Sequence, residues 1–189
     1  MATPTEKPGI GSACPQKPQA GPCSTLWALS HQQDQAARLV ADRHYNRRKP
    51  GSRKFCPPGQ QLVLKAPGQL PDALWVTLNQ RPEFTDHQWP DAWVNSLFRN
   101  EGTSLSSALI IDALAVTRYY WPTLPQQGCI TFVDSKKVKP KQHPGFCYLK
   151  AGFTHVGFTK VNGLHVFQLL PALFPAPRRA AGDFQLRFF

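Results

Sequence analysis

The spacing of apolar and polar positions predicts a series of short helices and strands along most of the chain. Ala36, Leu39 and Val40 recur with the helical period, after a Ser30 and Gln33 pair that is typical of a capping box. Other apolar runs are short and bounded by Pro, Gly, Asn or Asp, which is typical of strands. The pattern predicts helices over 31–43 and 104–120 and strands over 60–66, 73–79, 93–98, 129–133, 154–160 and 164–170.

The links between these segments predict how they are arranged. A turn rich in Pro and Gly separates 60–66 from 73–79, so these two runs are expected to form a buried antiparallel pair. A short helix is expected within 145–153. Asn162 and Gly163 then separate the last two strands, a dipeptide that strongly favours a hairpin. We therefore expect an α/β (α+β) fold, a mixed central sheet flanked by helices and closed by a C-terminal hairpin.

Length and composition are those of one domain with two extensions. A chain of 189 residues buries one substantial core and is short for two. Residues 1–24 carry five prolines and few apolar side chains, so we expect a flexible tail. The domain is expected over 25–170. Residues 171–189 form a Pro- and Arg-rich extension whose last aromatic and aliphatic side chains are expected to dock; these are Phe184, Leu186, Phe188 and Phe189.

Several classes of protein are disfavoured by what the sequence lacks. No apolar run is long enough to span a membrane, and the N-terminus has no secretion signal, which predicts a cytoplasmic protein. The odd number of cysteines and the absence of a Cys-x-x-Cys pair argue against disulfides and against a thiolate zinc site. We expect free thiols at Cys14, Cys23, Cys56, Cys129 and Cys147, the last two near the core.

Residues 99–104 (Arg-Asn-Glu-Gly-Thr-Ser) join a predicted strand to a helix expected to open at the last two of them. Such a turn points unpaired backbone N–H groups at one spot, where the helix dipole also favours negative charge. Neither a Walker loop nor the three glycines of a dinucleotide fold is present. The turn predicts a phosphate site, with an ordinary capped helix as the alternative. Its residues are Arg99, Asn100, Gly102, Thr103 and Ser104.

The charge is strongly positive and unevenly distributed. The chain has 22 basic and 11 acidic residues, a formal net charge of +11, which exceeds what solubility requires. Clusters of this kind follow the phosphates of nucleic acids, although a solvated basic loop is the simpler alternative. The predicted nucleic-acid contacts are Arg43, Arg47, Arg48, Lys49, Arg53, Lys54, Lys136 and Lys137, with Lys139 and Lys141 close by.

Two motifs resemble those of the GNAT acyltransferases. Arg-x-x-Gly-x-Ser over 99–104 is similar to the loop with which GNAT proteins bind the pyrophosphate of acetyl-coenzyme A, with Ser104 in place of the usual Gly or Ala. Tyr148, Gly152 and Phe153 form a Tyr-x-x-x-Gly-Phe run that resembles the C-terminal GNAT signature, where the tyrosine lies near the thioester. The resemblance implies a GNAT-like fold and an acetyl-coenzyme A type of cofactor.

A closer resemblance covers most of residues 30–170. Residues 41–47, 96–102, 131–134 and 145–153 are similar to the Mom DNA-modification proteins of bacteriophages and their actinobacterial relatives. Mom proteins convert adenine in double-stranded DNA to an N6-carbamoylmethyl derivative, an anti-restriction modification. The resemblance implies this activity, within the host cytoplasm, and a bound iron ion. The matching residues are His44, Tyr45, Arg99, Asp134 and Tyr148.

Chemistry suggests a role for each matching residue. The exocyclic amine of adenine is a poor nucleophile, and His44 is the best candidate to remove its proton. Asp134 could orient that imidazole, accept the proton itself, or ligate a metal with His44 and Tyr45. Tyr148 is suited to protonate a leaving thiolate, and Arg99 to bind phosphate. Each residue also has a structural alternative, such as a helix end for His44 or a turn for Asp134.

The acceptor and the product are less determined. Adenine must be flipped out of the duplex, and Trp89, Trp93 and Phe55 are candidates to stack on it, although core packing is the stronger interpretation of all three. Simple acyl transfer does not explain the terminal amide of the Mom product. The alternatives are an ordinary GNAT acetyltransferase acting on a small amine or a protein, and a non-catalytic DNA-binding protein. The oligomeric state is open, and a dimer is compatible with the sequence.

Overall fold

The computed structural model describes residues 25–47, 49–80, 87–138 and 143–182. The predicted N-terminal tail, Cys14, Cys23, Arg48, Lys139, Lys141 and the four apolar residues near the C-terminus lie outside the described residues. No described helix is long and apolar enough to cross a membrane.

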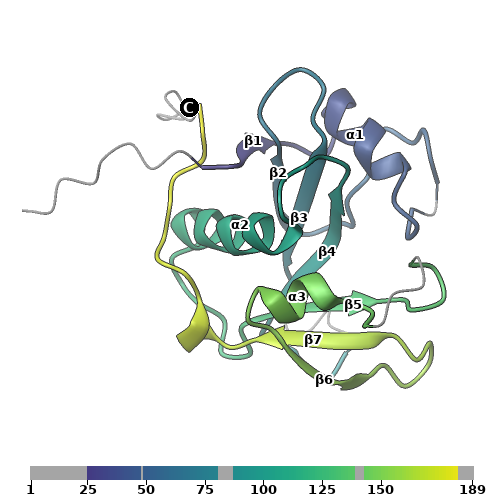
Figure 1. Ribbon diagram of the computed structural model, residues 1–189, viewed down its shortest axis with the longest axis vertical. Helices are drawn as coiled ribbons and strands as arrows, with labels where there is room; N and C mark the ends of the chain where they lie inside the picture. Colours follow the sequence, from purple (N-terminus) through teal and green to yellow (C-terminus); the bar gives the residue numbers. More distant parts are fainter. Residues whose placement is uncertain (1–24, 48, 81–86, 139–142, 183–189) are drawn as a thin grey trace, which may run out of the picture.

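Seven strands form one mixed sheet in the order β1-β2-β3-β4-β5-β7-β6 (Figure 1). β4 and β5 are parallel, and all other neighbouring strands are antiparallel. The strands are β1 (Ala28–Ser30), β2 (Gln60–Lys65), β3 (Ala73–Asn79), β4 (Trp93–Asn100), β5 (Cys129–Val133), β6 (Thr154–Phe158) and β7 (His165–Leu169). The helices are α1 (Gln35–Asp42), α2 (Ser106–Tyr120), α3 (Phe146–Lys150) and a 3-10 turn, η2 (Pro171–Leu173). The predicted mixed α+β arrangement is confirmed.

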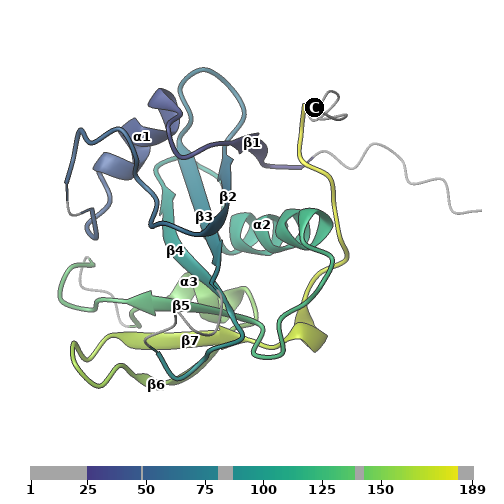
Figure 2. The ribbon, with the colours of Figure 1, turned by 180° about the vertical axis from the view of Figure 1, so that it is seen from behind.

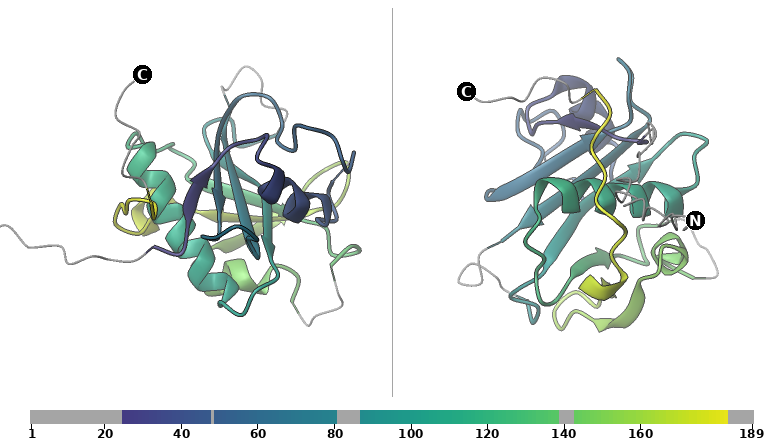
Figure 3. Two further views of the ribbon diagram at one scale, coloured as in Figure 1. Left: turned by 90° about the horizontal axis from the view of Figure 1, so that it is seen from above. Right: turned by 90° about the vertical axis from the view of Figure 1, so that its left-hand side faces the viewer.

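The helices cover both faces of this sheet. α2 and α3 lie together in front of it in Figure 1, and the view from behind brings α1 forward (Figure 2). Seen from above, the sheet separates α1 from α2 (Figure 3). Because both faces are covered, the central strands are apolar on both sides, and six of the seven residues of β3 are buried.

The first helix starts later than the sequence pattern predicts. The predicted capping residue Ser30 lies in β1, and the N-cap is Asp34, whose carboxylate accepts hydrogen bonds from the N–H groups of Ala36 and Ala37. Ser30 donates to the same carboxylate (2.8 Å) and Lys65 pairs with it (2.7 Å). Burial alone raises the pKa of Asp34, but these hydrogen bonds outweigh it and lower the pKa to about 2. The cap therefore links α1 to two strands.

The buried face of α1 also differs from the expected one. Val40 is buried as predicted, with Ala37 and Ala41 beside it, whereas Leu39 is 47% exposed. The face that packs on the sheet is therefore rotated from the predicted one toward Ala37 and Ala41. The helix is only eight residues long, so few apolar positions were available to define its face from the sequence.

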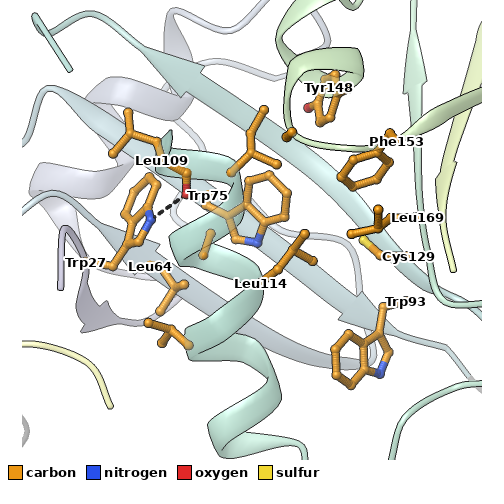
Figure 4. Packing of buried hydrophobic residues seen from close by; sticks show 14 of the residues in the cluster. Trp27, Leu64, Trp75, Trp93, Leu109, Leu114, Cys129, Tyr148, Phe153 and Leu169 are labelled. Atoms are coloured by element: carbon orange, nitrogen blue, oxygen red, sulfur yellow. Dashed lines mark hydrogen bonds between the residues drawn. The ribbon is translucent and has the colours of Figure 1, made fainter. Parts of the chain in front are cut away.

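The larger core lies between α2 and the sheet and is built on aromatic side chains (Figure 4). Trp27, Trp75 and Trp93 are fully or almost fully buried there. The Trp27 indole N–H donates to the carbonyl of Leu109 (2.9 Å), which satisfies its one polar atom. Trp93 was a candidate for base stacking, and this position assigns it to the core.

The C-terminal extension is packed on the domain as far as residue 182. Phe174 stacks on Trp93 with ring centroids 5.4 Å apart, and Arg178 pairs with the buried carboxylate of Asp112 (2.7 Å). Ala181 forms a parallel bridge with Ala28 of β1. The folded unit therefore continues beyond the predicted boundary at 170.

Candidate functional site

The parallel strands β4 and β5 separate at the centre of the sheet. Trp93–Asn95 of β4 pairs with Cys129–Thr131 of β5, and the pairing ends there. β4 nevertheless continues to Asn100 and β5 to Val133. On its other side β4 stays paired with β3, but Val76 faces Leu97 and Thr77 faces Asn95, so Ser96 is an extra residue in β4. A bulge of this kind bends its strand and locally disrupts the ladder. The bulge coincides with the point where β5 loses β4.

A hollow of about 150 Å³ occupies this separation. Three residues implied by the resemblance, His44, Tyr45 and Tyr148, are among its lining. Asn46, Ser96, Phe98, Phe132 and Cys147 also line it, together with six further residues of β4, β5 and the segments around α3. Residues distant in sequence therefore meet where the sheet opens, as expected for a site in an α/β sheet.

His44 lies beyond the end of α1, and its ring stacks on Tyr45 with centroids 4.4 Å apart. Its Nδ1 accepts a hydrogen bond from the Asn46 N–H (3.2 Å), and the ring also bonds to the backbone of Phe98. The second bond must come from a protonated Nε2, because Nδ1 is already an acceptor. Burial, with a smaller contribution from the positive charge of Arg99, lowers the pKa of His44 to about 4. At neutral pH His44 is therefore an uncharged base.

Asp134 does not reach the imidazole of His44. Its carboxylate accepts from the N–H of Lys136 (3.0 Å) and lies 3.8 Å from the Lys137 ammonium, as in an ordinary turn. Its backbone, by contrast, bonds to the phenol of Tyr45, whose pKa is raised chiefly by burial. The predicted orienting role of Asp134 is therefore wrong in this structure; Asn46 and Phe98 hold the ring instead.

Tyr148 belongs to a buried polar network that spans the two separating strands. Its hydroxyl donates to the side-chain oxygen of Asn95 (2.7 Å), and the Asn95 amide donates to the carbonyls of Val76 and Leu97. Thr131 of β5 also bonds to Asn95. Burial raises the pKa of Tyr148 well above its ordinary value. Tyr148 keeps its proton, but that proton is committed to Asn95, which makes it a weak acid for a leaving group.

An iron site at His44, Tyr45 and Asp134 does not fit this arrangement. The ring nitrogens of His44, the phenol of Tyr45 and the carboxylate of Asp134 all have other hydrogen-bond partners. Across the part of the chain that the structure describes, no three His, Cys, Asp or Glu side chains are placed to bind one metal ion. Iron stays a prediction that only the resemblance supports.

The predicted phosphate turn has both the expected feature and an unexpected neighbour. α2 begins at Ser106, later than predicted, and within the described chain the backbone N–H groups of residues 103–108 have no hydrogen-bond acceptor. The N–H of Gly102, however, donates to the side chain of Asn100. A Cβ added to Gly102 would lie 1.9 Å from a carboxylate oxygen of Asp72. The anion-binding capacity therefore lies after Gly102, in the amides that open α2.

Two arginines with predicted roles are held by one carboxylate. Glu101 accepts three hydrogen bonds from Arg43, at 2.8, 3.1 and 2.5 Å, and one from Arg99 at 2.5 Å. The hydrogen bond from Arg43, followed by that from Arg99, lowers the pKa of Glu101 to about 2. Neither arginine is a free phosphate ligand in this arrangement. The positive charge of Arg99 still acts on His44.

The basic segment after α1 divides into internal and exposed side chains. Arg47 is 9% exposed, pairs with Asp42 (2.7 Å) and donates to Ser52 and to the carbonyl of Lys54, so it shapes the loop. Its guanidinium is therefore engaged within the loop, and its contact with DNA stays a prediction. Among the predicted DNA contacts in the described part of the chain, the exposed cations outside these internal pairs are Lys49, Arg53, Lys54, Lys136 and Lys137. Lys137 lies near Asp134.

Sequence reasoning did not identify Asn95, Ser96 or Phe132. The Ser96 hydroxyl is buried and has no hydrogen-bond partner in the described part of the chain. Phe132 lines the gap and three neighbouring hollows. Trp89 and Phe55, two of the predicted stacking residues, each line one hollow and are 8% and 6% exposed. The nearby thiol of Cys56 is not a nucleophile at neutral pH, because burial raises its pKa to about 12.

Comparisons with protein-family models, with curated proteins and with solved structures find no match to this chain. The function of the chain is therefore inferred from the geometry of the gap and from the resemblance of its motifs.

Proposed function

We propose that the protein is a GNAT-like enzyme that uses an acyl-coenzyme A to modify an amine, with adenine N6 of double-stranded DNA as the acceptor, as in the Mom proteins. One observation carries the proposal. An uncharged histidine lies at the point where β4 and β5 separate, beside a hollow in the sheet, and the amides of residues 103–108 have no acceptor among the described residues, where β4 leads into α2. β4 thus runs from the gap that holds this base to a series of backbone amides that suit an anion.

The architecture supports a GNAT-like scaffold. A mixed sheet flanked by helices, a short helix carrying Tyr148, and two antiparallel strands after it are what the resemblance implies. Among the described residues, the edge of β4 beyond Asn95 has no strand partner on the β5 side. Coenzyme A has an extended arm with amide groups, and such an arm can pair with a free strand edge.

The residues of the gap fit the coenzyme at the level of donor chemistry. The six consecutive N–H groups of residues 103–108, at the start of a 15-residue helix, suit a pyrophosphate, since the helix dipole adds to their partial charges. The carboxylates of Asp72 and Glu101 lie close to this turn and disfavour an anion, although two arginines neutralise Glu101. When bound, acyl-coenzyme A supplies an activated acyl group.

The mechanism assigned to the chain itself concerns proton transfer. His44 carries its free lone pair on Nδ1, and the bond that occupies it is a 3.2 Å contact from the nearby Asn46 N–H. An entering amine would replace that contact and pass its proton to Nδ1 while its nitrogen bonds to the acyl carbon and the thioester carbon–sulfur bond breaks, which would release the coenzyme as its thiolate. The bond from Nε2 to the Phe98 backbone would hold the ring during this step. This step balances for an acetyl product, whereas a carbamoylmethyl product also needs a donor of the amide nitrogen. Both products require removal of the amine proton, and the mass of the product decides between them.

An ordinary GNAT acetyltransferase is the second candidate, and one observation favours it. Arg43, Arg47 and Arg99 are engaged within the protein, so the free basic surface is smaller than the net charge suggests. Such an enzyme would consume acetyl-coenzyme A with a small amine or a protein and would leave DNA adenine unchanged.

Mass analysis of nucleosides from cells that express the protein tests the function. We expect an adenine derivative heavier by a carbamoylmethyl or an acetyl group with the wild type, and none with His44→Ala. His31→Ala is the matched control, because His31 is an exposed histidine that does not line the gap. Unmodified adenine with the wild type, together with turnover of acetyl-coenzyme A on a small amine, would establish the second candidate.

Calorimetry with coenzyme A tests the anion site separately. Proline at the first helical position is well tolerated and removes one N–H, and Leu105 already has the extended backbone (φ −63°, ψ 124°) that precedes proline. Ser106→Pro should keep the fold and weaken coenzyme A binding roughly tenfold or more. Ser106→Ala is the control, since it removes only the hydroxyl that contacts Asn100. Equal affinity of both variants would contradict an anion site at this helix.

A further inference from the structure

Phe132 is the only residue of β5 that is not buried. On one side it pairs with Val166 of β7, and on the other side β4 has already left the ladder. The two parallel strands have thus already separated at Phe132, and its side chain is half-buried.

Four hollows meet at this side chain. Besides the gap of about 150 Å³, neighbouring hollows of about 480, 450 and 610 Å³ all include Phe132 in their lining. His44 lines the first two, and so do Ser96 and Leu97. The ring of Phe132 is thus shared between the gap that holds the histidine base and a larger groove beside it.

The aromatic neighbours of Phe132 hold it from the side. The rings of His87 and Trp89 lie 5.7 and 6.4 Å from it, tilted by 53° and 61°. Neither neighbour is stacked flat on Phe132. A flat ligand stacked on this ring would therefore not have to displace a parallel aromatic partner.

Polar groups that lack partners among the described residues accompany this ring. The hydroxyl of Ser96 is buried and has no hydrogen-bond partner there. The side-chain amide of Asn46, which lines three of the four hollows, makes no hydrogen bond to any other described residue. An amide side chain pairs well with a donor and acceptor placed side by side on a heterocyclic base, and adenine is its usual partner.

The charge around the groove distinguishes between acceptors. Lys136 and Lys137 line the same hollow as Asn46 and outnumber its one carboxylate, Asp134, which disfavours a cationic lysine substrate and suits a group next to phosphates. An aliphatic amine would also leave the aromatic face and the amide unused. A nucleobase uses all of these features, through its flat face, its polar edge and the phosphate beside it.

We propose that the groove centred on Phe132 is the nucleobase site, with the base stacked on the Phe132 ring and its polar edge directed to Asn46 and Ser96. This inference rests on the proposed function and adds to it the residues that hold the acceptor. The exocyclic amine then lies toward His44, which lines the same two hollows as Ser96 and Phe132. Phe132 takes the place of Trp89, Trp93 and Phe55 as the stacking residue.

Binding of free adenosine, followed by NMR titration of the protein, tests the site without requiring catalysis or duplex opening. Phe132→Ala should weaken adenosine binding roughly 5- to 150-fold, the effect of losing one base-aromatic stack. Phe132→Trp should restore it. Phe146→Ala is the matched control, because Phe146 is an exposed aromatic residue on α3, 49% accessible, and lines none of these hollows.

Asn46→Ala gives an independent measure of the edge contact. It should weaken adenosine binding while leaving the binding of inosine, which has no exocyclic amine, much less affected. Folding of each variant is checked by its thermal transition. A variant of Phe132 that fails to fold is replaced by Phe132→Leu, which keeps the apolar volume and lacks the aromatic face.

The outcomes separate this inference from the proposed function. Unchanged adenosine binding in Phe132→Ala, or no binding by the wild type, would overturn the nucleobase site, even if coenzyme A binding and adenine modification persist. Loss of adenosine binding in Phe132→Ala alone, in a protein that never modifies DNA, would support the site and contradict the enzymatic proposal.

Discussion

The two halves of β4 differ in their strand pairing, in their burial and in the partners of their polar groups. In the first half, Trp93–Asn95, the strand is paired on both sides, and all three residues are buried. In the second half it has, among the described strands, only β3 as a partner. There the Ser96 hydroxyl has no described partner and Phe98 lines a hollow. The paired half supports the core, and the open half gathers the groups that can react or bind.

The difference between the two halves shows where a sheet can hold a binding or catalytic site. Hydrogen-bonded strands lie about 4.8 Å apart, which leaves no room for a ligand between them. Once the strands separate, backbone groups and side chains that were paired or covered become available, and nearby loops can add others. His44, from the segment after α1, reaches the gap in this way. Asn95 stands at the boundary and bonds to both strands and to Tyr148.

The largest effect is expected from Trp93→Ala in the paired half. Removing this indole, which packs against Trp121 and Phe174, should lower the free energy of unfolding by about 3 to 5 kcal/mol. Ser96→Ala in the open half should be neutral or slightly stabilising, since it removes a buried hydroxyl that has no partner among the described residues. Denaturant unfolding of both variants measures the contrast. Similar losses in the two variants would contradict the division of β4.

Asn95→Ala tests the boundary between the halves. It leaves the hydroxyl of Tyr148 and the carbonyls of Val76 and Leu97 without their buried partner, at about 1 to 3 kcal/mol for each group that stays unsatisfied. Tyr148→Phe removes one hydrogen bond and should cost only about 1 kcal/mol. Denaturant unfolding should rank the two variants in this order. A smaller loss of unfolding free energy for Asn95→Ala than for Tyr148→Phe would show that Asn95 is not the centre of the hydrogen-bond network.

The pH dependence of stability and of kcat/KM tests whether His44 is buried beside the open half of β4. Its pKa is about 4 in the folded protein and near 6.5 when unfolded, so the unfolded chain binds a proton more readily. The contribution of His44 to stability is complete above pH 6.5 and is lost as the pH falls toward 4. The acid limb of kcat/KM should fall near pH 4 for the same reason. His44→Gln should remove its share of the stability change; an acid limb near 6.5 would place His44 in water.

The smallest effect concerns the rim of the open half. If the exposed Lys49, Arg53 and Lys54 bind DNA phosphates, changing all three to Ala should lower the log-log salt slope of binding by about 0.9 for each phosphate that is no longer neutralised. Arg47→Ala should instead reduce stability, because Arg47 holds Asp42 and the loop. Fluorescence titration of duplex DNA at several salt concentrations measures the slope. An unchanged slope in the triple variant would assign these side chains to solvent.

Local patterns in the sequence predicted most of the elements. The strands over 60–66, 73–79 and 129–133 and the helix ending at Tyr120 agree with the structure to within two residues at each end. These segments are long or strongly apolar, and their periodicity is a property of the chain itself. The predicted start of α1 was wrong because Asp34, and not Ser30, caps the helix. Contacts of Asp34 with Ser30 of β1 and Lys65 of β2 hold it in this position.

The sequence by itself determined the mixed α+β order of elements and the basic charge, and through the resemblance it predicted that His44, Tyr45 and Tyr148 belong to one site. Only the tertiary structure decided which groups are free to act. It joined Arg43 and Arg99 to Glu101, turned Arg47 inward and left Phe132 half-buried at four hollows. The physical reason is that a side chain's partners come from distant segments, and a gap between strands exists only where two of them fail to pair.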